Sequence, residues 1–363
     1  SRMISNGVLS LFLVVSLTAC GGAVVLPADY AELNTLLYDT YNGDPRREIH
    51  QFDITTQTSS LWLKGEGHLS DPLRSPDRTQ VAYLVWNEID EYFSLWLADA
   101  NGQNSRQLGD THLCADGPMV EWSFDSRYIA LRSTPGNNTA YIHILDTTTN
   151  QEVLFIGGSE FEWSPTASRL AVSSGGGLVL IDVPERTEQW LCNDIFRTEL
   201  YISDPQYVLD WLPDGRTVVF VGANRNTLKR SIYAVDIDDT NFRNLIPDIT
   251  QLPAQYIGGI QVSPNGKYVL GDDGVHLFVW GIDNGEVRAL ASGLTGPIVW
   301  APDSASIVFG SYQDPTGGPK VRTWELFQVA LADGVITRLT YDGACLLYTS
   351  PSPRDRTRSR MPS

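Results

Sequence analysis

Short apolar runs recur along the chain and predict β-strands rather than helices. Most are apolar at consecutive positions, which is typical of strands covered on both faces. The clearest runs are residues 81–84, 128–131, 170–172, 218–221, 268–270 and 307–309. No segment of the same length shows a helical period of 3.6 residues, so the pattern indicates an all-β fold.

A turn sequence precedes each apolar run. It reads W-S-F-D from Trp122, W-S-P from Trp163, W-L-P-D-G from Trp211 and W-A-P-D from Trp300. Pro fixes φ at the start of such a turn, Asp binds a nearby backbone N–H, and Gly accepts positive φ. The equivalent positions are separated by 38 to 51 residues and are Tyr30, Arg74, Trp122, Trp163, Trp211, Val262 and Trp300. A repeat of this length indicates a propeller or a solenoid.

Each repeat continues with a third strand, a polar turn and a last short strand. The third strand usually ends at an aspartate, in the order Asp53, Asp99, Asp146, Asp182, Asp236 and Asp283. We predict that these aspartates cap the following turn and that the tryptophans pack between repeats. Four strands in each of seven repeats predict one all-β domain over residues 24–344, a seven-bladed β-propeller of four-stranded antiparallel blades.

These motifs resemble the TolB-like, WD-repeat-like β-propeller family. Its unit reads roughly W-S-P-D-G, an apolar strand, a second strand that ends in Asp, and a basic-Leu-Thr close. The resemblance covers nearly all of residues 24–344. The turn motif is faint only in the first repeat, where Y-A-E-L from Tyr30 replaces it, and the seventh repeat has Ala330 in place of the strand-ending Asp. It implies the propeller fold. It does not imply one activity, because the family includes envelope scaffold proteins and the propeller domains of larger hydrolases.

The N-terminal segment has the features of an export signal. Residues 8–19 are apolar but too few to span a bilayer as a helix, as expected for a signal peptide. The sequence L-T-A-C that ends at Cys20 resembles the bacterial lipobox, which implies cleavage before Cys20 and acylation of its thiol. We therefore predict a signal peptide over 1–19, an acylated tether over 20–23, and attachment to a bacterial envelope membrane on the periplasmic or surface side.

The C-terminal segment does not match the repeat. Residues 345–355 read C-L-L-Y-T-S-P-S-P-R-D and resemble one reading frame of a transposon-end sequencing adapter. We therefore treat 345–363 as non-native and expect the natural chain to be truncated near residue 344.

Composition excludes several classes of function. The chain has 26 Lys and Arg against 43 Asp and Glu, a net charge of −17, so a nucleic-acid partner is not expected. It contains no G-x-S-x-G, H-E-x-x-H or C-x-x-C motif. No motif nominates a nucleophile, a base or a set of metal ligands, and we predict no catalytic residue and no cofactor. We expect a monomer that meets a membrane only through its anchor.

Four acidic residues precede tryptophan positions. They are Asp29, Glu121, Glu162 and Asp210. Innermost strands line the channel of a propeller, so these carboxylates are candidates for a ring that binds a cation or a basic ligand. Pairing of each carboxylate with a neighbouring backbone N–H or arginine is the alternative.

The longest connections are expected on one face of the propeller. Strand parity places there residues 39–47, 86–94, 109–119, 191–206, 247–259 and 310–323. Long loops on a rigid scaffold often bind partners, and we predict that a protein or glycan partner docks here. The densest acidic and aromatic cluster is Trp86, Glu88, Asp90, Glu91, Tyr92 and Phe93. Cys114 and Cys192 lie on the same face and are candidates for a disulfide in an exported chain.

Three functions remain open at this point. The first is a lipid-anchored, non-catalytic binding or scaffold propeller of the cell envelope. The second is the N-terminal propeller of a prolyl-oligopeptidase-like serine peptidase whose hydrolase domain would follow residue 344. The third is a glycan-processing propeller with a metal ion in its channel.

Overall fold

The computed structural model describes a β-rich chain. The described residues are 13–17, 22–26, 35–39, 48–53, 58–65, 67–87, 92–109, 119–134, 139–202, 208–246, 257–273, 275–293, 298–301, 303–311, 315 and 325–338. The described residues include the helix α1 (Asn193–Thr198). None of the described segments forms a helix of the length and apolarity needed to cross a bilayer.

The first half of the chain forms antiparallel sheets from consecutive strands. A three-stranded sheet contains β3 (Thr35–Asp39), β4 (Glu48–Asp53) and β5 (Thr58–Lys64). The next contains β6 (His68–Arg74), β7 (Gln80–Asn87), β8 (Tyr92–Asp99) and β9 (Arg106–Gln107). Two more contain β10 (Val120–Trp122), β11 (Tyr128–Ser133), β12 (Tyr141–Asp146) and β13 (Gln151–Gly157), then β14 (Glu160–Trp163), β15 (Arg169–Ser174), β16 (Gly177–Asp182) and β17 (Thr187–Leu191).

The second half continues the same arrangement. A five-stranded sheet contains β18 (Leu200–Tyr201), β19 (Leu209–Trp211), β20 (Thr217–Asn224), β21 (Arg230–Asp236) and β22 (Arg243–Asn244). The last two contain β23 (Gly259–Val262), β24 (Tyr268–Asp272), β25 (His276–Gly281) and β26 (Val287–Ser292), then β27 (Ile298–Trp300), β28 (Ser306–Ser311), β29 (Glu325–Ala330) and β30 (Ile336–Arg338).

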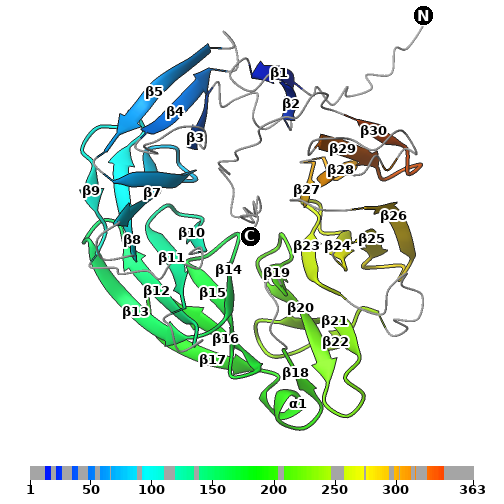
Figure 1. Cartoon of the computed structure of the whole chain (residues 1–363). Helices are drawn as coiled ribbons and strands as arrows, with labels where there is room; N and C mark the ends of the chain where they lie inside the picture. Colours follow the sequence, from blue (N-terminus) through cyan, green and yellow to red (C-terminus); the bar gives the residue numbers. More distant parts are fainter. Residues whose placement is uncertain are drawn as a thin grey trace, which may run out of the picture.

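The sheets follow one another around a ring (Figure 1). Strands β10, β14, β19 and β23 lie towards the middle, and β13, β17 and β26 lie at the periphery. Hydrophobic cores lie between neighbouring sheets: Leu84 and Leu97 pack with Ile129 and Leu131 across one boundary. The apolar runs are therefore strands with two buried faces, as the sequence predicts.

Tryptophan side chains join neighbouring inner strands. Each indole N–H donates to the backbone carbonyl of the residue before the equivalent position in the preceding sheet. The pairs are Trp122 to Leu73 at 3.1 Å, Trp163 to Glu121 at 3.2 Å, Trp211 to Glu162 at 3.0 Å and Trp300 to Gln261 at 3.3 Å. The tryptophans thus combine burial with a directed bond between sheets, which confirms their predicted packing role.

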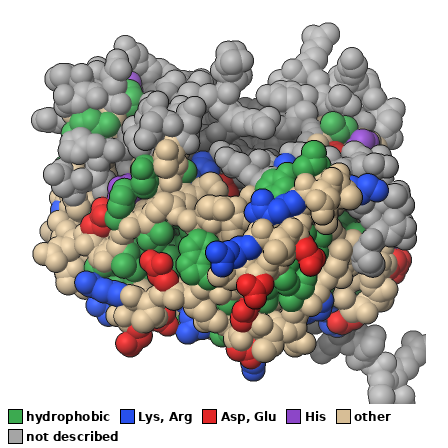
Figure 2. Space-filling model, turned by 90° about the horizontal axis from the view of Figure 1, so that it is seen from below, with side chains coloured by type: hydrophobic (Ala, Val, Ile, Leu, Met, Phe, Trp, Pro, Cys, Tyr) green, Lys and Arg blue, Asp and Glu red, His purple; other side chains and the backbone are tan. Residues whose placement is uncertain are grey.

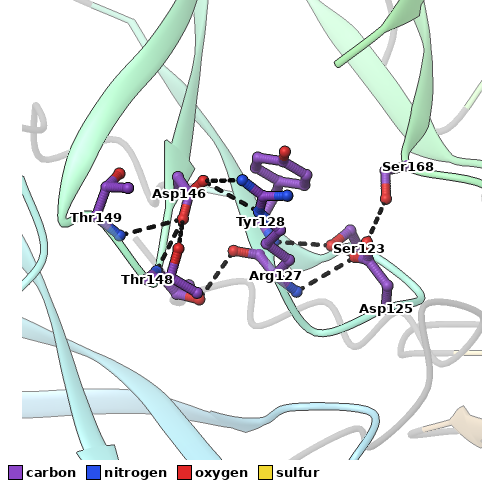
Figure 3. A network of polar contacts seen from close by, with 9 residues as sticks. Ser123, Asp125, Arg127, Tyr128, Asp146, Thr148, Thr149 and Ser168 are labelled. Atoms are coloured by element: carbon purple, nitrogen blue, oxygen red, sulfur yellow. Dashed lines mark hydrogen bonds and ion pairs between the residues drawn. The ribbon is translucent and has the colours of Figure 1, made fainter. Parts of the chain in front are cut away.

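Hydrogen bonds to aspartate close the turns that join strands (Figure 3). The Ser123 hydroxyl donates to Asp125 at 2.6 Å, and the Arg127 backbone N–H donates to the same carboxylate at 3.2 Å. Asp146 ends β12 and accepts from the backbone N–H groups of Thr148 and Thr149 at 2.8 and 3.2 Å. The predicted capping role is therefore confirmed at Asp146.

Charged side chains of both signs mix with apolar ones on the side of the molecule seen in Figure 2. Acidic and basic groups alternate there over short distances. The negative net charge of the chain is therefore not gathered into one acidic patch on the described part of this side.

Several details differ from the sequence-based expectation. Five sheets have the expected four strands, the sheet with β20 has five, and the first has three among the described residues. The extra strand and α1 occupy a segment expected to be a loop, where Phe196 is buried and its carbonyl accepts from Arg225 at 2.7 Å. No described strand joins the first sheet to the last, so closure of a seven-bladed ring stays a prediction.

The N-terminal segment contributes a hairpin of β1 (Leu13–Leu17) and β2 (Gly22–Leu26). Cys20, the Tyr30 position and residues 345–363 lie outside the described residues. The signal, tether and adapter predictions are not tested by this hairpin.

Candidate functional site

The predicted aromatic cluster lies on a β-hairpin rather than on a long loop. Strand β7 continues to Asn87 and β8 begins at Tyr92, with Trp86 paired to Phe93. The rings of Trp86 and Phe93 are 4.7 Å apart at 55°. Glu88, Asp90 and Glu91 lie outside the described residues.

Phe93 faces the next sheet along the chain. It packs against a core that contains Leu84 and Leu95 from its own sheet and Leu131 from β11. Because side chains alternate along a strand, Trp86 projects to the same side as Leu84. The hairpin therefore presents its aromatic pair towards the β10–β13 sheet, whose β12 and β13 lie next to β8 in Figure 1.

A second aromatic group lies on the β10–β13 sheet. Tyr141 and Phe155 stack at 4.9 Å and 14°, and the His143 ring lies 4.9 Å from Phe155 at 55°. Phe155 is 54% exposed, although it is a large apolar side chain. His143 pairs with Leu131, which belongs to the core shared with the β6–β9 sheet, so His143 lies on the side of the strand that faces that sheet. We call Trp86, Phe93, Tyr141, His143 and Phe155 the aromatic surface.

Ser133, His143 and Glu152 form a hydrogen-bonded relay within this surface. The Ser133 hydroxyl lies 2.8 Å from His143 Nε2, and Glu152 Oε2 lies 3.0 Å from His143 Nδ1. An ionised carboxylate can only accept, so in the neutral tautomer of His143 that donates to Glu152, Nδ1 carries the proton and Nε2 accepts from the Ser133 hydroxyl. Exposure rises outwards along the relay, with Ser133 7% exposed and the side chains of His143 and Glu152 18% and 40% exposed.

Sequence reasoning missed this relay because no motif contains it. The three residues lie on three successive strands, β11, β12 and β13, and only strand pairing brings them together. The available signal was the histidine on β12, at a position where the equivalent strands of other sheets carry large or apolar residues such as Trp96 and Phe278.

Comparison with known proteins identifies solved structures of similar fold. No family model matches the chain, and no curated protein matches its sequence. An oligogalacturonate lyase solved in complex with manganese is similar in structure, with a TM-score of 0.57 over 89% of this chain and 97% of its own, at 16% identity. The β-propeller domain of the trilobed protease from Pyrococcus furiosus has a TM-score of 0.52 over 84% of this chain and 94% of its own, at 15% identity.

The chain folds as a β-propeller. TolB from Acinetobacter baumannii is also similar, with a TM-score of 0.45 over 82% of this chain and 76% of its own, at 15% identity. At these identities the likeness concerns the fold alone, and the activity must be argued from this chain's own residues.

The predicted channel acids lie on successive inner strands of the propeller. Glu121, Glu162 and Asp210 come from β10, β14 and β19, and the tryptophan bonds described above connect these strands. Glu121 and Glu162 are 8% and 3% exposed. Asp210 accepts from the backbone N–H groups of Trp211 and Val262, both at 2.7 Å, and so bridges to the next sheet.

The geometry of Asp210 is that of a structural bridge between sheets. Asp29 lies outside the described residues. Within the part of the chain that the structure describes, no group of three His, Cys, Asp or Glu side chains is arranged to hold a metal ion.

Cys192 is a buried free thiol at the start of α1. Burial and the nearby Asp239 carboxylate raise the pKa of this thiol to about 12. Its backbone N–H donates to Asp239 at 2.6 Å. Because Cys114 lies outside the described residues, the disulfide stays a prediction.

Proposed function

We propose that this propeller binds a neutral saccharide on its aromatic surface. The exposed stack of Tyr141 and Phe155 beside the polar ring of His143 carries the proposal. Aromatic rings offer flat apolar faces to the C–H side of a sugar ring, and a few nearby polar groups then fix its orientation. His143 and Glu152 supply such groups beside Phe155.

Charge favours a neutral ligand. The net charge of −17 opposes the approach of a polyanion. One similar structure is named as a lyase of oligogalacturonate, which is a polymer of acidic sugars. The present chain is expected to discriminate against such a polymer by long-range repulsion.

Binding is tested with an array of neutral oligosaccharides and of oligogalacturonate, followed by calorimetric titration of the best ligand. Removal of the exposed ring in Phe155→Ala is expected to weaken binding about 2- to 10-fold, since an aromatic contact contributes about 0.5–1.5 kcal/mol. Trp190 provides a matched control because it is also exposed, at 46%, and occupies the equivalent position in the next sheet, where it pairs with Val179. Unchanged affinity in Phe155→Ala, equal losses in both variants, or a preference for oligogalacturonate would contradict the proposal.

The proposed location is a membrane of the bacterial envelope, on its periplasmic or surface side, with the propeller tethered through Cys20. The L-T-A-C sequence after a short apolar run supports this proposal. Bacterial expression with an alkyne fatty acid should label the wild-type chain and leave Cys20→Ser unlabelled. Equal labelling of both chains, or no labelling of either chain, would contradict the proposed tether.

The peptidase alternative retains one supporting observation, since a similar propeller is a domain of a protease. The intact gene decides it, because a G-x-S-x-G sequence downstream of residue 344 is required.

A further inference from the structure

The equivalent serines of other repeats show what a serine with a purely structural role does at the position of Ser133. Ser133, Ser174 and Ser311 each lie eleven residues after the tryptophan position, at the ends of β11, β15 and β28. Ser174 donates to the carbonyl of Gly157 at 2.7 Å, and Ser311 donates to the carbonyl of Gly293. Both bonds fasten a sheet to the end of the preceding one. Ser133 instead bonds to His143.

The position of His143 is also exceptional among the repeats. On the third strand of its sheet, His143 pairs with Leu131, which is the ninth residue after Trp122. The equivalent residues are large or apolar: Trp96, Val179, Tyr233, Phe278 and Phe327. Packing between sheets therefore accepts an apolar side chain at this position and does not require an imidazole.

The atoms of the relay are connected as a nucleophile, a general base and an orienting acid. The serine hydroxyl meets Nε2, and the carboxylate meets Nδ1, at 2.8 and 3.0 Å. These separations lie within the range for a serine activated by a histidine that a third group holds in position. The ring proton must lie on Nδ1, because only this tautomer leaves Nε2 free to receive the proton of the Ser133 hydroxyl.

We propose that Ser133, His143 and Glu152 hydrolyse small carboxylic esters. Ser133 Oγ bonds to the ester carbonyl carbon while its proton passes to His143 Nε2. The tetrahedral species collapses, the bond to the alcohol oxygen breaks, and His143 returns the proton to the leaving alkoxide. Water then attacks the acyl-serine, His143 accepts a proton from that water, and the departing Ser133 Oγ takes the proton back as the acid leaves. Glu152 stays ionised and holds the Nδ1 proton throughout.

The substrate class follows from exposure and surroundings. Ser133 is 7% exposed, so access to its hydroxyl is restricted, and we assign a short acyl group such as acetyl to the substrate. The stacked rings of Tyr141 and Phe155 lie beside the His143 ring of the relay, which suits an acyl ester carried on a sugar hydroxyl. The choice of this alcohol rests on the proposed function, whereas the ester chemistry of Ser133 does not.

The first test uses the full wild-type chain. Treatment with diisopropyl fluorophosphate followed by peptide mass spectrometry should place the phosphoryl group on Ser133 and not on Ser174. Hydrolysis of p-nitrophenyl acetate should be lost in proportion to labelling. Absence of label on Ser133 in the folded chain, or equal label on Ser174, overturns the proposal.

Variants separate chemistry from folding. Ser133→Ala is expected to abolish labelling and acetate release, and His143→Gln to reduce the labelling rate about 10²-fold or more, as for loss of a general base. Glu152 is a positioning residue, so Glu152→Gln should lower the rate and Glu152→Asp should restore part of it. Ser174→Ala is the matched control and should retain the full rate while its inter-sheet bond is lost. A Glu152→Gln rate equal to wild type contradicts the relay.

The outcomes also separate this inference from the proposed function. Saccharide binding by Ser133→Ala with no ester hydrolysis by wild type would leave the binding surface and remove the relay chemistry. Labelling of Ser133 without saccharide binding would support the relay chemistry and contradict the proposed binding surface.

Discussion

Asp146 shows how a single carboxylate fixes two turns at the end of a strand. It is 2% exposed and accepts from Thr148, Thr149 and the Arg127 guanidinium (Figure 3). Burial alone would raise the pKa of this carboxyl, but the hydrogen bonds from Thr148 and Arg127 bring it below its usual value. The ionised form is therefore favoured by folding.

The first prediction concerns the pH dependence of this group. A carboxyl whose pKa is lowered in the folded state stabilises the fold above its unfolded pKa, and this contribution disappears as pH falls through the folded pKa. Asp146→Asn should lower the free energy of unfolding by about 1.5–3 kcal/mol at pH 7, the range for hydrogen bonds to a charged group. Urea titrations should show that the difference from wild type shrinks as pH falls below about 4.

Asp283 is an exposed control for this prediction. It lies in the equivalent turn after β25, two residues beyond Gly281, which occupies the position of Asp146. Asp283→Asn should change the stability by no more than about 0.5 kcal/mol, as is usual for exposed substitutions. An Asp146→Asn effect that stays constant from pH 7 to pH 3 would refute the role assigned to the carboxylate.

At the scale of elements, the inner strands are linked by the indole bonds rather than by strand pairing. Trp163 is 1% exposed, and its N–H bonds to the carbonyl of Glu121 in the preceding sheet. Trp163→Phe keeps most of the apolar burial but removes the indole bond to that carbonyl, while β10 remains paired with β11. Loss of one hydrogen bond costs about 0.5–1.5 kcal/mol, and the urea midpoint should fall accordingly.

Trp190→Phe provides the comparison, because the Trp190 side chain is 46% exposed on β17. Its effect should lie within about 0.5 kcal/mol of wild type. Equal stabilities of the two variants would show that the indole bonds contribute nothing beyond packing.

At the scale of the whole molecule, each sheet is formed by strands that are consecutive in the chain. Neighbouring sheets associate through apolar cores and the tryptophan bonds, so long-range order is built by stacking similar units. The aromatic surface arises at one such boundary, between the β6–β9 and β10–β13 sheets. It therefore depends on how two repeats stack, and not on one repeat alone.

The sequence by itself determined the all-β class, the repeat, the positions of most strands and the roles of Trp163 and Asp146. These features follow from local turn chemistry and from the period of the apolar runs, which are properties of neighbouring residues. It also indicated Trp86 and Phe93 as surface residues of interest. It predicted a longer loop around them than the structure has, because strand pairing continues as far as Asn87 and Tyr92.

Only the tertiary structure decided that Ser133, His143 and Glu152 meet. They are separated by ten and nine residues along the chain, and their contact depends on the pairing of three strands and on a register shift between Ile144 and Leu145. A shift of one residue would send a side chain to the opposite face of the sheet. Local sequence specifies that strands form, whereas the alignment of one strand with another, and hence which polar atoms meet, is set by the packing of the whole sheet between its neighbours.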